Sequence, residues 1–166
     1  MASIKLKGNP IHTSGNLLKV GDKAPAFTLV NAELQDVTLK TLAGKKKLLS
    51  IVPSLDTDVC ATSTKKFNDF AKSHPNCHIL VISTDLPFAQ KRFCQQEKIA
   101  NVSTLSMMRS KDFGKDYGVL IADGPLAGVL ARAILVLDET DKVIYSELVP
   151  EITQEPNYDA ALSMLD

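Results

Sequence analysis

The sequence predicts an α/β fold: a mixed central β-sheet flanked by helices, with an added N-terminal β-hairpin. Short apolar runs alternate with amphipathic helical patterns, which indicates parallel strands joined by helices. Two later apolar runs flank a polar turn, which adds an antiparallel pair. With 166 residues, 45% hydrophobic content and no internal repeat or linker, the chain is expected to form a single domain over residues 1–166.

The first part of the chain predicts short antiparallel strands. Residues 4–13 alternate around a turn signal at Gly8-Asn9-Pro10, which gives a hairpin over about residues 1–15. A second short pair is predicted at residues 27–30 and 37–39.

The core of the sheet begins at residues 48–52, which are apolar almost without alternation, as expected of a strand covered on both faces. An amphipathic helix follows from Cys60, with apolar side chains at helical spacing. Residues 79–82 form another buried strand. Asp85 then stands in the N-cap region of a helix that opens at Pro87 and runs to about residue 98.

The last part of the chain supplies a short strand, a short helix, a hairpin and a closing helix. These are expected at residues 102–105, 113–117, 131–137 with 143–149, and 158–165. Parallel strands therefore come first and antiparallel strands later. A mixed sheet built in this order resembles the thioredoxin-like fold.

Charge and composition exclude several classes of partner. Nineteen Lys and Arg balance nineteen Asp and Glu, so no overall field attracts nucleic acid or an anionic membrane. The run Lys45-Lys46-Lys47 is interpreted as a solvated turn before the buried strand rather than as a basic patch.

The sequence also predicts where the protein works. The first residues lack an apolar stretch long enough for a signal peptide, and residues 128–137 are too short to span a bilayer and contain Arg132. We therefore expect a cytoplasmic protein, in which cysteines are catalytic or redox-active rather than structural.

The segment from Pro53 to Cys60 joins the first core strand to its helix and places Cys60 where the helix begins. The positive end of a helix favours thiolate over thiol. Lowering the pKa of a thiol from its ordinary value of about 8.5 to about 6 requires about 3.4 kcal/mol. A helix end typically supplies about 0.3–1 kcal/mol and occasionally about 2. A cation or further hydrogen-bond donors are therefore expected near Cys60.

Two residues are candidates for this role. Thr57 lies three positions before Cys60, and its hydroxyl can turn back toward the sulfur and an incoming oxygen. Arg132 is an isolated charge at the head of the apolar strand predicted at residues 131–137. The residues alone leave two explanations of Arg132 open: a cation of the site, or a strand-end arginine whose guanidinium reaches water.

The other two cysteines differ in their surroundings. Cys94 falls on the later helix, and together with Cys60 it suggests redox chemistry. Cys77 is followed by His78, but adjacent strand residues point to opposite faces, and a metal site needs more ligands. We therefore interpret Cys77 as a small buried hydrophobe and expect no metal or other cofactor.

The pattern Pro53-x-x-x-Thr57-x-x-Cys60 resembles that of peroxiredoxins, and the full octapeptide resembles their bacterial thiol peroxidase branch, an atypical two-cysteine group. Further stretches in register extend the resemblance to nearly the whole chain: Ser83-Thr84-Asp85-Leu86-Pro87-Phe88-Ala89-Gln90, Arg92-Phe93-Cys94, Tyr117-Gly118-Val119, Ala122-Asp123-Gly124-Pro125-Leu126, Ala131-Arg132-Ala133 and Glu151-Ile152-Thr153.

The resemblance implies a role for each matching residue. Cys60 is the peroxidatic cysteine, Thr57 positions the peroxide, and Arg132 holds the thiolate and polarises the O–O bond. Pro53 shields the pocket, and Cys94 is the resolving cysteine. The same resemblance implies an antioxidant enzyme that reduces hydrogen peroxide and organic hydroperoxides. It implies a Cys60 sulfenic acid, a Cys60–Cys94 disulfide within one subunit, thioredoxin as reductant, and a homodimer.

This cycle predicts a conformational change. A disulfide requires Cα atoms about 4.4–6.8 Å apart, and two helix-bound cysteines are expected to lie farther apart than that. We therefore expect the first turn of the Cys60 helix and part of the Cys94 helix to unwind during each turnover.

Other functions fit the sequence less well. A thioredoxin-type disulfide exchanger requires Cys-x-x-Cys, but Ser63 stands three residues after Cys60. A cysteine phosphatase requires Cys-x5-Arg, but Lys66 occupies that position, and the three histidines carry no motif of a cysteine hydrolase. A non-catalytic redox sensor or holdase would use the same cysteines and stays open as an additional role.

Overall fold

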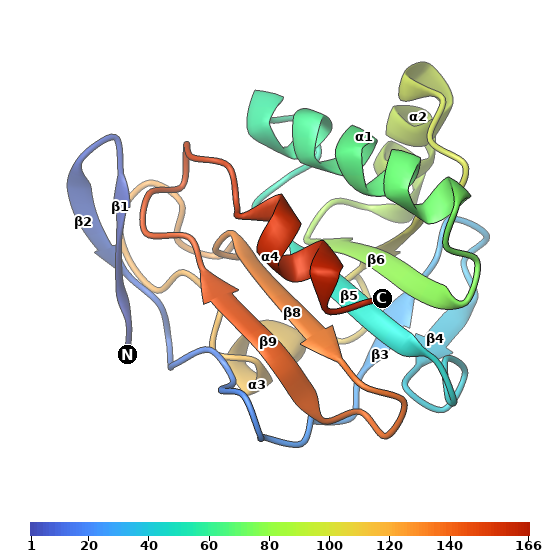
Figure 1. Ribbon diagram of the computed structural model, residues 1–166. Coiled ribbons are helices and arrows are strands. Elements are labelled where there is room, and N and C mark those ends of the chain that lie inside the picture. Colours follow the sequence, from blue (N-terminus) through green and yellow to red (C-terminus); the bar gives the residue numbers. More distant parts are fainter.

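The computed structural model describes residues 1–166 as a seven-stranded sheet and a separate two-stranded hairpin (Figure 1). The order of strands across the large sheet is β4-β3-β7-β6-β5-β8-β9. Its strands are β3 (Thr28–Val30), β4 (Asp36–Thr38), β5 (Lys46–Ile51), β6 (Cys77–Ser83), β7 (Ser103–Ser106), β8 (Ala133–Leu137) and β9 (Val143–Leu148). Strands β5, β6 and β7 are parallel, and the remaining pairs are antiparallel. The predicted mixed α/β class is confirmed.

Three helices cover one face of this sheet: α1 (Asp58–Lys72), α2 (Pro87–Glu97) and α4 (Tyr158–Ser163). Phe67 of α1 packs in one cluster with Leu48 of β5 and with residues of α4, whereas Phe93 of α2 packs in another with Val81 of β6. These contacts follow from the period of the strands, because alternate side chains point to the same face.

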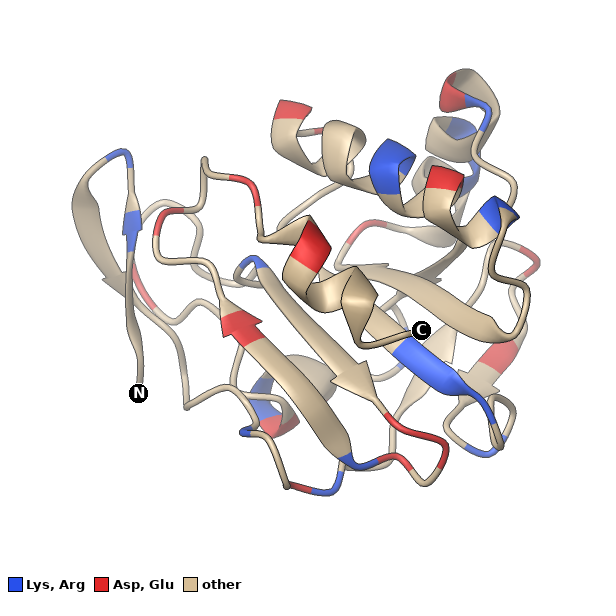
Figure 2. Cartoon of the chain, viewed as in Figure 1, with Lys and Arg blue, Asp and Glu red and all other residues tan.

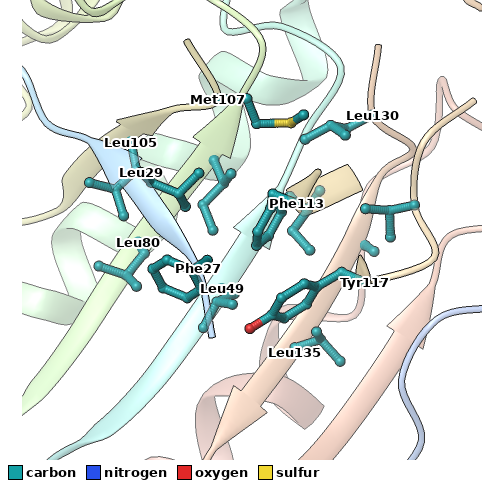
Figure 3. Close-up of a cluster of buried hydrophobic side chains, with 14 of the residues drawn as sticks. Phe27, Leu29, Leu49, Leu80, Leu105, Met107, Phe113, Tyr117, Leu130 and Leu135 are labelled. Carbon is teal, nitrogen blue, oxygen red and sulfur yellow. The ribbon is translucent and has the colours of Figure 1, made fainter. Parts of the chain in front are cut away.

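The opposite face of the sheet carries the larger core. Leu49, Leu80 and Leu135 come from β5, β6 and β8 and lie beneath Phe113 and Tyr117, which stand at the two ends of the short helix α3 (Phe113–Asp116) (Figure 3). Both faces are therefore covered, which explains why the strands are apolar without alternation.

The N-terminal hairpin lies against the end of the chain that follows β9. Its strands β1 (Ser3–Leu6) and β2 (Asn9–His12) are joined through Lys7 and Gly8, both of which have positive φ. The predicted hairpin is confirmed, but the turn falls earlier than Gly8-Asn9-Pro10 because Asn9 and Pro10 already belong to β2. The Lys5 amide donates to Pro150 O at 2.8 Å and the Ile152 amide donates to Lys5 O at 2.9 Å.

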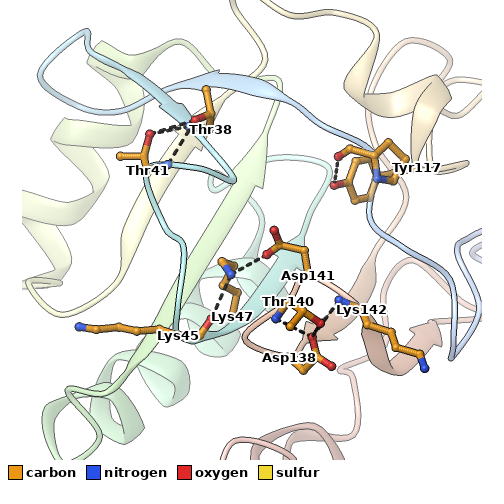
Figure 4. A network of polar contacts seen from close by, with 10 residues as sticks. Thr38, Thr41, Lys45, Lys47, Tyr117, Asp138, Thr140, Asp141 and Lys142 are labelled. Carbon is orange, nitrogen blue, oxygen red and sulfur yellow. Dashed lines mark hydrogen bonds and ion pairs between the residues drawn. The ribbon is translucent and has the colours of Figure 1, made fainter.

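The lysine run before the sheet departs from its prediction. Lys45 is exposed, but Lys46 and Lys47 already belong to β5, and Lys47 is fully buried. Its Nζ donates to Asp141 at 2.6 Å and to Lys45 O at 3.0 Å (Figure 4). The interpretation as a solvated turn was therefore wrong for Lys47, because a carboxylate from the β8–β9 turn neutralises it.

Charges are otherwise dispersed over the molecule. Both signs of charge occur together on α1, α2 and α3, and most strands carry few or no charged residues (Figure 2). None of the helices is long and apolar enough to cross a membrane.

Candidate active site

Cys60 lies in the first turn of α1, directly after the loop that leaves β5. Its side chain is fully buried and belongs to an apolar cluster with Val52, Leu55 and Val81. The carbonyl of Cys60 accepts a hydrogen bond from the Thr64 hydroxyl at 2.7 Å. The sequence thus folds locally as predicted, with the thiol at the positive end of a helix.

Arg132 reaches this thiol from a distant part of the sequence. Strands β5 and β8 are antiparallel and pair Ile51 with Ala133, so the end of β5 and the start of β8 meet at one edge of the sheet. Arg132 immediately precedes Ala133, is 2% exposed, and donates from Nη1 to Cys60 Sγ at 2.9 Å. Its Nε donates to Ile152 O at 2.8 Å, which fixes the guanidinium.

The explanation of Arg132 as a water-facing strand end is therefore wrong. The buried guanidinium is a charged hydrogen-bond donor held directly against the sulfur. This supplies the cation that the helix end alone lacks.

A cavity of about 430 Å³ opens in front of this pair. Pro53, Thr57, Val59 and Arg132 are among the residues that line it. The remaining lining includes three apolar side chains: Leu6 from the N-terminal hairpin, Leu126 from the connection between α3 and β8, and Ile152 from the segment after β9. The arrangement offers a small apolar chamber with a cation beside a buried thiol.

Thr57 is the N-cap residue of α1 and lines the same cavity. Its hydroxyl donates to Ser54 O at 3.1 Å rather than turning to the sulfur. Because the proton of this hydroxyl is directed to Ser54, its oxygen is available to accept a hydrogen bond from a molecule in the cavity.

Cys94 does not share this cavity. It lies on α2 at the edge of the apolar cluster that contains Cys60, and it borders a different cavity of about 360 Å³. Its Sγ lies 4.0 Å from Thr104 Oγ1, and burial raises the pKa of the thiol although the contact with Thr104 opposes this. Both thiols are free.

Cys77 lies at the start of β6, away from both cavities described above. Its Sγ approaches Leu165 O at 3.6 Å, and burial raises the pKa of its thiol. It packs at the margin of the cluster beneath α1 and α4 but is only half-buried, so the interpretation as a small buried hydrophobe holds for its packing and not for its full burial.

Asp85 is the polar residue whose position the sequence misjudged. The N-cap of α2 is Leu86 and no side chain caps the helix. The Asp85 carboxylate instead accepts the Ser54 hydroxyl and the Leu55 backbone N–H, each at 2.8 Å. The available signal was topological: β5 and β6 are parallel neighbours, so the residues that follow them meet at one edge.

The redoxin family model matches residues 19–162, so the chain belongs to the redoxin family. Thiol peroxidases of Mycobacterium bovis and Mycobacterium tuberculosis are each 53% identical to the chain over 165 residues, which is 99% of both sequences. The predicted resemblance to thiol peroxidases is confirmed.

Solved structures agree with this placement. A peroxiredoxin-like protein from Aquifex aeolicus superposes with a TM-score of 0.93 at 46% identity, covering 99% of this chain and 96% of that one. A thiol peroxidase from Chromobacterium violaceum gives a TM-score of 0.90 at 28% identity, covering 98% and 94%. The predicted thioredoxin-like architecture and the class of peroxiredoxin-type oxidoreductase are confirmed.

Proposed function

We propose that this chain reduces hydroperoxides through a thiol cycle in which Cys60 is the attacking sulfur. The observation that carries the proposal is the 2.9 Å contact between Cys60 Sγ and Nη1 of Arg132, which lines a cavity. Its full-length relatives carry the name thiol peroxidase.

The first step uses the buried Cys60 and groups that line the cavity beside it. The Cys60 thiolate attacks one oxygen of the peroxide, so that an S–O bond forms and the O–O bond breaks. The sulfur is oxidised to sulfenic acid, and the leaving oxygen takes a proton and departs as an alcohol or water. Arg132 stabilises the charge that develops on the leaving oxygen. Thr57 accepts a hydrogen bond from the peroxide, and Pro53 limits the access of water.

The apolar lining of the cavity suits organic hydroperoxides as substrates in addition to hydrogen peroxide. Leu6, Leu126 and Ile152 give an apolar surface to the same cavity that Arg132 lines. An alkyl group buried there gains roughly 25 cal/mol for each Å² of apolar area removed from water. Hydrogen peroxide gains nothing comparable from this surface.

In the second step, Cys94 attacks the sulfenic acid, a disulfide forms, and water leaves. The thiols are free and lie on different helices, Cys60 is fully buried, and Cys94 borders a cavity that Cys60 does not line, which supports local unwinding before they meet. Burial raises the pKa of Cys94, so unwinding of α2 also makes this thiol easier to ionise.

The contacts of α1 suggest where unwinding stops. No side chain caps the first turn at Thr57. Beyond it, the Ser63 hydroxyl and Tyr158 OH lie 2.8 Å apart, and Asn68 accepts the amides of Ala100 and Asn101 at 3.2 and 2.7 Å. These contacts anchor the later turns of the helix, whereas the first turn is held through Cys60 itself, by Arg132 and Thr64, so these two contacts must break for it to unwind.

The reductant in this proposal is thioredoxin, which would return the disulfide to the dithiol in the cytoplasm. The active species would be a homodimer. The reductant and the homodimer extend the resemblance of the chain to its family, whereas the location is the one expected from the sequence.

A steady-state assay tests the proposed function. Peroxide consumption is followed with thioredoxin, thioredoxin reductase and NADPH, using hydrogen peroxide and cumene hydroperoxide in parallel. The wild type should turn over both, and Cys60→Ser should turn over neither, whereas the matched variant Cys77→Ser should retain full activity. A single oxidation without recycling would instead indicate the redox sensor.

A further inference from the structure

Asp85 joins the two segments that lead into α1 and α2. It follows β6 and precedes α2, yet its carboxylate points across to the loop after β5. One oxygen accepts the Ser54 hydroxyl at 2.8 Å. The other accepts the Leu55 backbone N–H and the Ser83 hydroxyl, both at 2.8 Å. Three donors from two segments therefore converge on one carboxylate.

The carboxylate is itself held in place by a buried polar network. Ser83 Oγ accepts the Asp85 backbone N–H at 3.3 Å and Gln90 Nε2 at 3.1 Å. The Ser106 hydroxyl donates to Asp85 O at 2.6 Å. Ser83, Gln90 and Ser106 are all buried. A side chain fixed in this way gives the loop a rigid point of attachment.

A chain of hydrogen bonds continues from Asp85 to the candidate active site. Ser54, which donates to Asp85, accepts the Asp56 amide on its hydroxyl at 3.1 Å and the Thr57 hydroxyl on its carbonyl at 3.1 Å. Ser54 also lies directly between Pro53, which lines the cavity, and Leu55, which packs in the apolar cluster with Cys60.

We infer that Asp85 is a positioning residue for the peroxide step: through Ser54 and Leu55 it holds Pro53 and Thr57 in register with Cys60 and Arg132. It touches neither the sulfur nor the cavity, so it acts on the geometry of the loop. The inference rests on the proposed function. It gives a role to Asp85, whose side chain does not cap α2.

The test compares two reactions of the same sulfur. In a chain carrying Cys77→Ser and Cys94→Ser, Cys60 is the only thiol, and its oxidation by hydrogen peroxide and its alkylation by iodoacetamide are timed separately. Asp85→Ala should slow oxidation by about 10- to 100-fold, because small misplacements of positioning groups carry losses of that size. Alkylation needs a thiolate but no oriented peroxide, so Asp85→Ala should not slow it relative to the same chain with Asp85 intact.

Two further variants separate positioning from general support of the fold. Asp85→Asn should recover most of the oxidation rate, because its amide oxygen still accepts the Leu55 N–H and its amide group can donate to Ser54. Asp138→Ala is the matched control, since Asp138 also accepts three hydrogen bonds, from Thr140 and Lys142, but at the end of β8 remote from Arg132. It should leave both reactions unchanged.

If Asp85→Ala does not fold, Ser54→Ala replaces it. That variant should slow oxidation by about 3- to 10-fold, the equivalent of one ordinary hydrogen bond, without slowing alkylation. An unchanged oxidation rate, or equal losses in both reactions, would overturn the inference. Failure of the proposed function has a different signature, because the unmodified chain would then consume no peroxide through Cys60.

Discussion

Arg132 Nη1 lies 2.9 Å from Cys60 Sγ although 72 positions separate the two residues. The antiparallel pairing of β5 with β8 creates this contact, because it sets the start of β8 beside the end of β5. The Ile152 carbonyl then fixes the guanidinium from the other side at 2.8 Å. Sheet topology therefore places the cation, and the C-terminal segment orients it.

Arg132→Ala should reduce the second-order rate of peroxide reduction by about 10²- to 10³-fold, the loss typical when a donor to developing charge is removed. Arg132→Lys should recover part of it, because an ammonium keeps the charge but cannot form the same two-sided fork. Stopped-flow oxidation measures the rate, and the ultraviolet absorbance of the thiolate measures how much Cys60 is ionised at neutral pH. Wild-type rates in Arg132→Ala would show that another group stabilises the sulfur.

Cys94→Ser should still form one sulfenic acid per chain but lose turnover with thioredoxin. Oxidation of Cys60 needs no second thiol, whereas disulfide formation does. Labelling with a dimedone probe and mass spectrometry count the sulfenic acid, and Cys77→Ser serves as the control that keeps both reactions. Normal turnover by Cys94→Ser would mean that Cys77 or a thiol from another molecule resolves the intermediate.

How far the sequence predicts this molecule depends on whether the relevant signal is local. Strand β5 was predictable because burial on both faces gives a continuous apolar run, and helix α1 because burial of one face gives a helical period. The residue pattern alone made Arg132 only a candidate for the cation beside Cys60, and the family resemblance favoured that role. Asp85 and Lys47 were misjudged because local rules treat an Asp before Pro as a cap and a lysine run as solvated. The partners that override these rules lie 31 and 94 positions away.

The buried pair of Lys47 and Asp141 should be asymmetric in its effect on stability. Lys47 is fully buried, whereas the Asp141 side chain is 20% exposed. Asp141→Ala should lower the free energy of unfolding by about 3–5 kcal/mol, because it leaves a buried ammonium unpaired. Lys47→Met should cost less, because the remaining carboxylate can turn to water. Urea denaturation measures both changes, and equal losses would contradict this account.

Asp141 also has a φ of +68°, which alanine adopts with strain. Asp141→Asn is therefore the matched variant, since asparagine tolerates this conformation and removes only the charge. The decrease in the free energy of unfolding caused by Asp141→Asn should lie between the decreases caused by Lys47→Met and by Asp141→Ala. A loss as large as that of Asp141→Ala would assign the whole effect to charge.

Glu151 should make the wall of the cavity sensitive to acid. Its carboxylate accepts the backbone N–H groups of Gly8 at 2.9 Å and Lys7 at 3.1 Å, and so ties the hairpin turn to the segment that contains Ile152. The hydrogen bond from Gly8 has the largest effect on the pKa of Glu151 and lowers it. The bonds from Lys7 and from the Thr153 backbone N–H lower it further. A lowered pKa means that the stabilisation is complete above the ordinary value of about 4.3 and is lost as the pH falls through the folded-state pKa.

The amide resonances of Lys7 and Gly8 should therefore shift together below about pH 4.3 in the wild type, and should lose this titration in Glu151→Gln. Because Leu6 of the same hairpin lines the cavity, Glu151→Gln should raise KM for cumene hydroperoxide more than for hydrogen peroxide. Glu139→Gln, an exposed substitution in the β8–β9 turn, is the control. Equal KM changes for the two peroxides would separate the hairpin from substrate binding, because only the bulky substrate needs the apolar wall that Glu151 holds in place.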